Sequence, residues 1–176
     1  MAARASLRAL PNLISSSRVV IAAGFVGSHR TDVRLGLVGL AAATDFLDGW
    51  IARRAKWTSR WGALIDPIAD RVFALVAVAT FVWTGALSIV GLLVMLSRDI
   101  MTAVGFFVAR IVPWLRPVQF KARLSGKIVT VLQYATFVLL LLRMPTGTRI
   151  ALWLVGLSSA YSIVDYTVAL WHARAT

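Results

Sequence analysis

The sequence predicts an all-α integral membrane protein, a bundle of six transmembrane helices, on three observations. Hydrophobic residues make up 59% of the 176-residue chain, and its mean hydropathy is +0.79. A soluble domain of this length is ordinarily less apolar. Six apolar stretches approach the roughly 20 residues that a helix needs to cross a bilayer. The charged residues lie mainly at the ends of these stretches, which is typical of membrane proteins.

The six predicted helices follow one another with short connections. They run from about residue 11 to 27, 33 to 51, 62 to 87, 88 to 110, 126 to 142 and 148 to 171. The first is short and begins with the polar run Ser15-Ser16-Ser17-Arg18, and a short basic segment separates the second from the third. A basic, proline-containing segment separates the fourth from the fifth. Because no soluble domain, low-complexity tract or repeat is visible, residues 1–176 are predicted to form a single domain.

The distribution of lysine and arginine predicts the orientation, because these residues are enriched in cytoplasmic loops. With the N-terminus inside, the inside segments carry twelve of them, and the outside loops carry four: Arg30, Arg34, Arg143 and Arg149. Both termini are therefore expected in the cytoplasm and the chain in the cell membrane. The net charge of +12 could suit nucleic acid. Since the basic residues flank apolar runs, no nucleic-acid partner is expected.

Composition also limits the chemistry of a metal site. Cysteine is absent, which excludes thiolate catalysis, disulfides and cysteine-based zinc sites. The two histidines, His29 and His172, lie near opposite ends of the chain, which argues against a histidine-rich site. Any metal is therefore expected to have oxygen ligands, as Mg²⁺, Mn²⁺ and Ca²⁺ prefer.

Four of the seven aspartates lie between residues 45 and 70, within or beside apolar stretches, and glutamate is absent. Asp45 and Asp48 are three residues apart near the end of the second predicted helix. Asp66 and Asp70 are four residues apart near the start of the third. Each spacing places its pair on one helix face. Because a short connection joins the helices, the four carboxylates are expected to converge at similar depth on the cytoplasmic side.

Four ionised carboxylates in one pocket would repel each other strongly at low dielectric constant. Two divalent cations, Mg²⁺ or Mn²⁺, would balance their charge. Such a pair could polarise a phosphoryl group and stabilise the attacking and leaving oxygens. The residues alone also allow an ion or proton transporter, or an aspartate that is a structural partner of an arginine.

Small residues surround the carboxylates. Gly49 and Ala52 follow Asp48 within about one turn, and Gly62 precedes the second aspartate pair by one turn. Glycine permits the close approach of a ligand or a neighbouring backbone, and Arg53 at the same end could pair with a phosphate. Each feature taken singly is also typical of helix packing in membranes.

Together these residues read Asp45-x-x-Asp48-Gly49-x-x-Ala52-Arg53, eight residues, Gly62-x-x-x-Asp66-x-x-x-Asp70. This resembles the full signature of the CDP-alcohol phosphotransferase family at every fixed position. The six-helix prediction is similar to that family too, so the resemblance covers essentially the whole chain.

The resemblance implies a role for each signature residue. Two Mg²⁺ or Mn²⁺ ions would be held by Asp45, Asp48, Asp66 and Asp70. Asp70 would also be the catalytic general base. The cytidine-diphosphate pocket would be formed by Gly49, Ala52, Arg53 and Gly62. An acceptor hydroxyl would attack the phosphorus that bears the lipid alcohol and release CMP. The family resemblance also implies a homodimer.

Shorter motifs concern the acceptor. Pro11-Asn12-Leu13-Ile14 followed by Arg18 resembles phosphatidylglycerophosphate synthases and CMP-forming cardiolipin synthases. Ser97-Arg98-Asp99 and Ala160-Tyr161-Ser162 are more similar to the cardiolipin synthases. The resemblance therefore implies phosphatidyl transfer from CDP-diacylglycerol to phosphatidylglycerol or glycerol 3-phosphate, in phospholipid biosynthesis. An inositol-phosphate acceptor is the alternative within the family.

Three basic residues are candidates for binding the acceptor's phosphate, because an anion needs cationic partners there. They are Arg98, Arg123 and Lys127. Arg123 and Lys127 are equally compatible with ordinary positive charge on the cytoplasmic side. Arg98 is equally compatible with a structural pair with Asp99 or Asp165.

Overall fold

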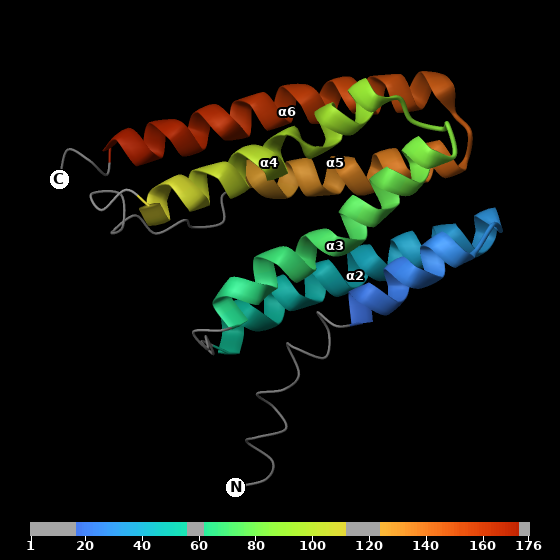
Figure 1. Cartoon of the computed structure of the whole chain (residues 1–176), viewed down its shortest axis with the longest axis horizontal. Helices are drawn as coiled ribbons and strands as arrows, with labels where there is room; N and C mark the ends of the chain where they lie inside the picture. Colours follow the sequence, from blue (N-terminus) through green and yellow to red (C-terminus); the bar gives the residue numbers. More distant parts are fainter. Residues whose placement is uncertain (1–16, 56–61, 112–123, 173–176) are drawn as a thin grey trace, which may run out of the picture. The chain divides into compact units, whose positions relative to one another are not determined.

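The computed structural model describes residues 17–55, 62–111 and 124–172, with side chains described for 17–47, 71–105, 126–165, 167 and 168 (Figure 1). Six helices lie in these segments: Ser17–Gly27, α2 (Thr31–Ala55), α3 (Gly62–Trp83), α4 (Ile89–Ile111), α5 (Leu124–Leu141) and α6 (Pro145–His172). This confirms the all-α class. The chain divides after Ala86 into two compact units.

In the first unit, the helix Ser17–Gly27 packs against both α2 and α3. Phe25 is fully buried and meets Phe73 and Phe81 of α3 edge to face, with both pairs of ring centroids 5.7 Å apart. On the α2 side, the Arg34 guanidinium lies 5.0 Å from the centre of the Phe25 ring. Arg34 Nε also donates to the Phe25 carbonyl oxygen at 3.1 Å. Phe25 thus connects the three helices described in this unit.

Replacing Phe25 by Ala should therefore lower the stability of the first unit strongly. Removing a fully buried phenyl ring costs about 3–5 kcal/mol, from lost transfer free energy and the cavity left behind. Thermal unfolding of the detergent-purified protein would measure the change. Phe46→Ala on α2 is the matched control, because the Phe46 side chain is largely exposed. Equal destabilisation by both variants would contradict this packing.

The connection into α2 is held by an exposed ion pair. Arg30 donates to Asp32 through Nη2 at 2.6 Å and Nε at 3.2 Å. This guanidinium lowers the pKa of the Asp32 carboxyl, which lies in the first turn of α2, where a negative charge is favourable.

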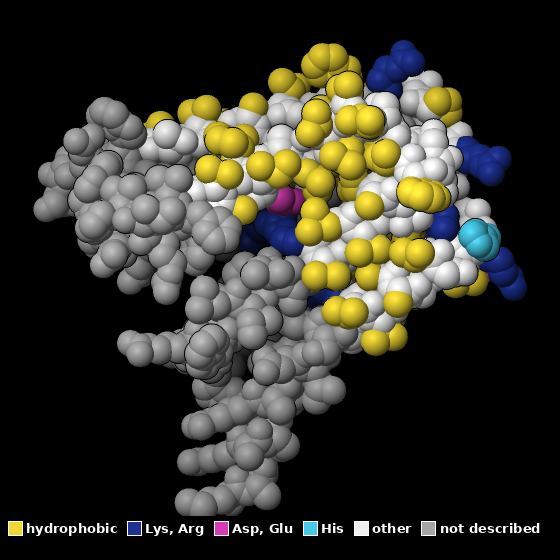
Figure 2. Space-filling view, viewed as in Figure 1, with side chains coloured by type: hydrophobic (Ala, Val, Ile, Leu, Met, Phe, Trp, Pro, Cys, Tyr) yellow, Lys and Arg dark blue, Asp and Glu magenta, His cyan; other side chains and the backbone are white. Residues whose placement is uncertain are grey.

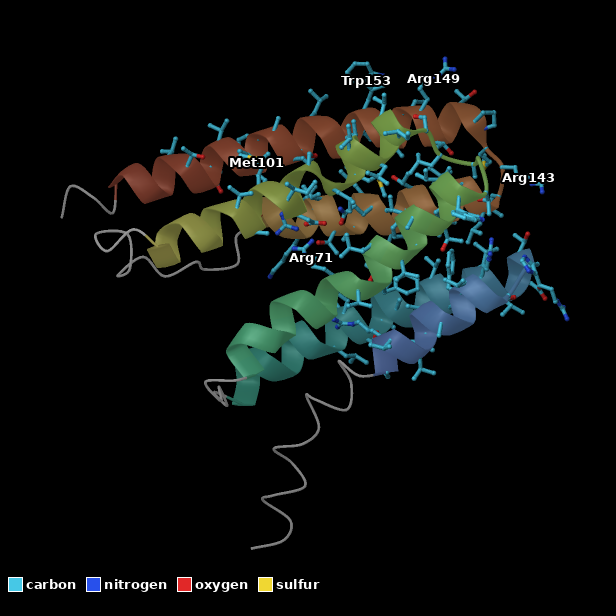
Figure 3. The ribbon with its side chains drawn as sticks, viewed as in Figure 1. Arg71, Met101, Arg143, Arg149 and Trp153 are labelled. Carbon is cyan, nitrogen blue, oxygen red and sulfur yellow. The ribbon has the colours of Figure 1, made fainter. Side chains whose placement is uncertain are left out.

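In the second unit, α6 packs against α4 and α5. Arg143, at φ 53°, ends α5: its N–H donates to the Leu140 carbonyl, and the Met144 N–H donates to the Leu139 carbonyl. These paired bonds are the Schellman arrangement. Figure 3 shows Arg143 in this turn and Arg149 at the same end of α6.

The helix predicted for residues 62–87 ends earlier, at Trp83. Gly85 takes φ 71° and donates to the Val82 carbonyl, while the Ala86 N–H donates to the Phe81 carbonyl. This second Schellman arrangement ends α3 before the residue the hydrophobic pattern predicts, because glycine adopts the left-handed conformation at no steric cost.

Among the described residues, one stretch is long and apolar enough, by length and composition, to cross a membrane: Pro145–Asp165. Ser17–Gly27, Arg71–Trp83 and Gly126–Leu141 are shorter apolar helices. Hydrophobic side chains are nonetheless abundant on the surface (Figure 2). On α6 the exposed ones recur every three or four residues, at Trp153, Leu157, Tyr161, Val164 and Val168. An exposed apolar stripe of this kind favours contact with lipid.

Candidate active site

The predicted aspartates lie on two helices of the first unit. Asp45 and Asp48 belong to α2, and Asp66 and Asp70 to the first half of α3. Because both segments are helical, the spacings of three and four residues place each pair on one face, as the sequence predicts. Asp45 is the signature residue whose side chain is described. The other seven signature positions lie outside the described side chains: Asp48, Gly49, Ala52, Arg53, Gly62, Asp66 and Asp70.

Asp45 has a cationic neighbour, Arg18. Arg18 Nη2 lies 3.6 Å from Asp45 Oδ1, and the Arg18 side chain is fully buried, whereas that of Asp45 is 31% exposed. A buried guanidinium is costly unless negative charge compensates it. Arg18 belongs to the N-terminal motif, but its contact with Asp45 was not among the predictions from sequence. An arginine within an apolar helix was the available signal, because intramembrane cations usually have acidic partners.

The helix Ser17–Gly27 also fixes the register of α2. Arg18 lies at Asp45, and Gly24 lies against the Leu37 side chain. From Arg18 to Gly24 the first helix advances six residues, while the contacted residues on α2 go back eight, from Asp45 to Leu37. These two helices run antiparallel, with Asp45 level with Arg18.

The same helix fixes the register of α3. Phe25 lies equally close to Phe73 and Phe81, so position 77 of α3 is level with Phe25. Position 70 lies seven residues before position 77, just as Arg18 lies seven residues before Phe25. If α3 runs parallel to the first helix, Asp70 is therefore level with Arg18.

Chain connectivity requires that direction. Gly62 lies 15 residues from position 77, about 22 Å along the axis, and Ala55 lies about 27 Å below the level of Leu37. With α3 reversed, these two ends would be about 50 Å apart. A six-residue connection spans at most about 25 Å. Hence α3 is antiparallel to α2, and Asp70 lies at the level of Asp45.

The electrostatics of this level favour bound cations. Asp48 and Asp66 lie within about 6 Å along the axis of Asp45 and Asp70 respectively. Four carboxylate residues thus occupy one end of two neighbouring helices. The single positive charge of Arg18 can neutralise at most one of the four carboxylates. An all-carboxylate donor set is what Mg²⁺ and Mn²⁺ prefer, so the residues fit the predicted metals. Among the described side chains, no three of His, Cys, Asp and Glu come together.

Of the predicted acceptor residues, two have described side chains. Arg98 on α4 is buried, with Nη1 3.6 Å from Asp99 Oδ1, so the Arg98–Asp99 pair expected as a structural alternative is present. The Arg98 guanidinium also lies against Gly126 on α5. Lys127 directly follows Gly126 and is exposed. Arg98 and the start of α5 therefore come together, whereas Arg123 lies outside the described residues.

Comparison with known proteins identifies the family of the chain. The profile of the CDP-alcohol phosphatidyltransferase family matches residues 8–169, nearly the whole chain. Helices and signature together define a membrane enzyme that transfers a phosphate-linked group. The chain belongs to the CDP-alcohol phosphatidyltransferase family and is an enzyme of that kind. The resemblance stated from the signature is thereby confirmed, and the enzyme prediction is favoured over the transporter.

Several curated relatives are similar to the chain. A CDP-diacylglycerol–glycerol-3-phosphate 3-phosphatidyltransferase of Yersinia enterocolitica is 33% identical over 144 residues, 74% of each chain. One of the same name from Cereibacter sphaeroides is 41% identical over 83 residues, 43% of this chain and 37% of the relative. A CMP-forming cardiolipin synthase of Rattus norvegicus is 32% identical over 105 residues, 57% of this chain and 35% of the relative.

Proposed function

We propose that this protein transfers the phosphatidyl group of CDP-diacylglycerol to the hydroxyl of a glycerol-type acceptor and releases CMP. The observation that carries this proposal is that the four signature aspartates lie at one level on α2 and α3. They do so in a chain that matches the family profile. Two of the relatives are CDP-diacylglycerol–glycerol-3-phosphate 3-phosphatidyltransferases, which supports CDP-diacylglycerol as the donor and favours glycerol 3-phosphate as one acceptor. Phosphatidylglycerol is the other acceptor we propose, from the motif around Arg98.

In the proposed reaction, the Asp70 carboxylate accepts the proton of the acceptor hydroxyl. The hydroxyl oxygen then forms a bond to the phosphorus that bears the diacylglycerol, and the bond from that phosphorus to the CMP oxygen breaks. Asp45, Asp48, Asp66 and Asp70 would hold two divalent ions, which when bound stabilise charge on the phosphoryl oxygens. Arg53 is assigned to the CDP phosphates because a guanidinium forms paired hydrogen bonds with them.

In this proposal, three small residues leave room for the nucleotide. Gly49, Ala52 and Gly62 have small or absent side chains, so the cytidine diphosphate can approach the helix backbone. Arg98, Arg123 and Lys127 are assigned to the acceptor's phosphate. The whole chain would act as one six-helix domain of the cell membrane, working as a homodimer. Both termini and the active site would face the cytoplasm, where soluble glycerol 3-phosphate and CMP are exchanged.

The acceptor is tested by offering alcohols one at a time. Detergent-purified protein with CDP-diacylglycerol and Mn²⁺ should release CMP in step with added glycerol 3-phosphate or phosphatidylglycerol. The lipid product, separated by chromatography, identifies which of the two is used. Turnover with inositol phosphate, and with neither glycerol compound, would replace this acceptor assignment while leaving the family chemistry intact.

A further inference from the structure

In the second unit, Arg98 lies in a buried polar cluster with Asp99 and Gln133. Arg98 is only 7% exposed and Gln133 only 3%. A buried cation in a helical membrane unit is costly, so its position is expected to serve a function. The contacts that hold the guanidinium in place come from both α4 and α5.

The first contact runs through Asp99. Its Oδ1 lies 3.6 Å from Arg98 Nη1, and its Oδ2 accepts a hydrogen bond of 3.2 Å from Gln133 Nε2. Gln133 Nε2 also donates to the Met95 carbonyl oxygen at 2.6 Å. The Gln133 amide thus ties α5 to α4 and fixes the carboxylate beside the guanidinium.

The second contact is with the backbone of α5. A Cβ atom at Gly126 would lie 3.0 Å from Arg98 Cζ and closer still to Nη2. Glycine is therefore required for the guanidinium to lie where it does. Gly126 lies seven residues, two helical turns, before Gln133, so both positions face α4 from the same side of α5. Gly126 thus lies directly against the Arg98 guanidinium, whereas Gln133 acts on it through Asp99.

We propose that Gly126 and Gln133 are positioning residues that set the Arg98 guanidinium against the start of α5, where Lys127 also belongs, to bind the phosphate of the acceptor. The inference rests on the proposed function. A guanidinium held from two sides loses less conformational freedom when it forms paired hydrogen bonds with a phosphate. Gly126 and Gln133 contribute through Arg98 and need no contact with substrate themselves.

The decisive variant is Gly126→Ala. The added methyl group meets the far end of a flexible side chain, so the guanidinium moves and the helix is retained. We expect the KM for glycerol 3-phosphate, or for phosphatidylglycerol if that is the acceptor, to rise about tenfold or more, as for loss of a charge-assisted hydrogen bond. The KM for CDP-diacylglycerol should stay unchanged and kcat should change far less. Gly105→Ala is the matched control, since a Cβ there meets nothing within 4 Å.

A double-mutant cycle with Arg98→Ala tests whether Gly126 acts through Arg98. In the Arg98→Ala background, adding Gly126→Ala should leave the acceptor KM nearly as it was, because coupled residues are not additive. Gln133→Leu should raise the acceptor KM in the same way and likewise have no further effect once Arg98 is removed.

If the activity of Arg98→Ala is too low to measure, the separate effects of Gly126→Ala on KM and kcat test the proposal by themselves. An unchanged acceptor KM in Gly126→Ala, with the wild type active, overturns this inference and leaves the proposed function standing. A wild type that releases no CMP with any acceptor refutes the proposed function instead.

Discussion

Asp70→Asn is expected to lower kcat for CMP release by about 10²- to 10⁴-fold, the range that general-base catalysis contributes. Asparagine keeps the size of the side chain but cannot accept the proton of the acceptor hydroxyl. The register of α3 against the helix Ser17–Gly27 places Asp70 at the level of Asp45, within the proposed metal site. Steady-state CMP release at saturating substrates measures the loss.

The control for Asp70→Asn is Asp32→Asn. It makes the same chemical change at an exposed aspartate in the first turn of α2, whose carboxylate is paired with Arg30. Its kcat should match the wild type. An Asp70→Asn enzyme that keeps more than a third of wild-type kcat would show that another group accepts the proton.

Removal of divalent cations is expected to lower CMP release at least as much as Asp70→Asn does. Chelation should reduce CMP release to the level seen without enzyme, and Mg²⁺ or Mn²⁺ should restore it. The reason is electrostatic, because four carboxylate residues lie at one level, and the ion pair between Arg18 and Asp45 engages one of them. Cation binding should also stabilise the fold, by about 2.7 kcal/mol when the cation concentration is a hundred times its Kd.

Thermal unfolding with and without Mn²⁺ separates binding from catalysis. The wild type and Asp32→Asn should both unfold at higher temperature when Mn²⁺ is present. Asp66→Asn should lose most of that increase, because it removes one of the four proposed ligands. A rise of the same size in Asp66→Asn would place the cation elsewhere on the protein.

The helices and the signature were accessible from sequence because they depend on local patterns. Hydrophobic runs predicted six helical segments, and the aspartate spacing of three and four residues was already sufficient to assign each pair to one face. The end of α3 was predicted too late, at residue 87, because the apolar pattern continues past Gly85. That glycine ends the helix through its backbone conformation, which hydrophobicity does not register.

The contacts between distant segments were beyond sequence reasoning. Nothing in the spacing of Arg18 and Asp45 indicates that they meet, since their approach depends on how the first helix packs on α2. The same holds for Arg98 and Gly126. The sequence marks Arg98 as an intramembrane cation, but the contacts of Gly126 with Arg98 and of Gln133 with Asp99 depend on the register between α4 and α5.

The most direct test of the central claim is acceptor-dependent release of CMP from CDP-diacylglycerol by the purified protein, with the lipid product quantified in the same reaction. The proposed chemistry predicts one CMP for each molecule of new phospholipid, only when acceptor and Mg²⁺ or Mn²⁺ are both present. CMP formed without acceptor and without new phospholipid would indicate hydrolysis. No CMP under any combination of glycerol-type acceptor and cation would contradict the assignment of this donor and acceptor class.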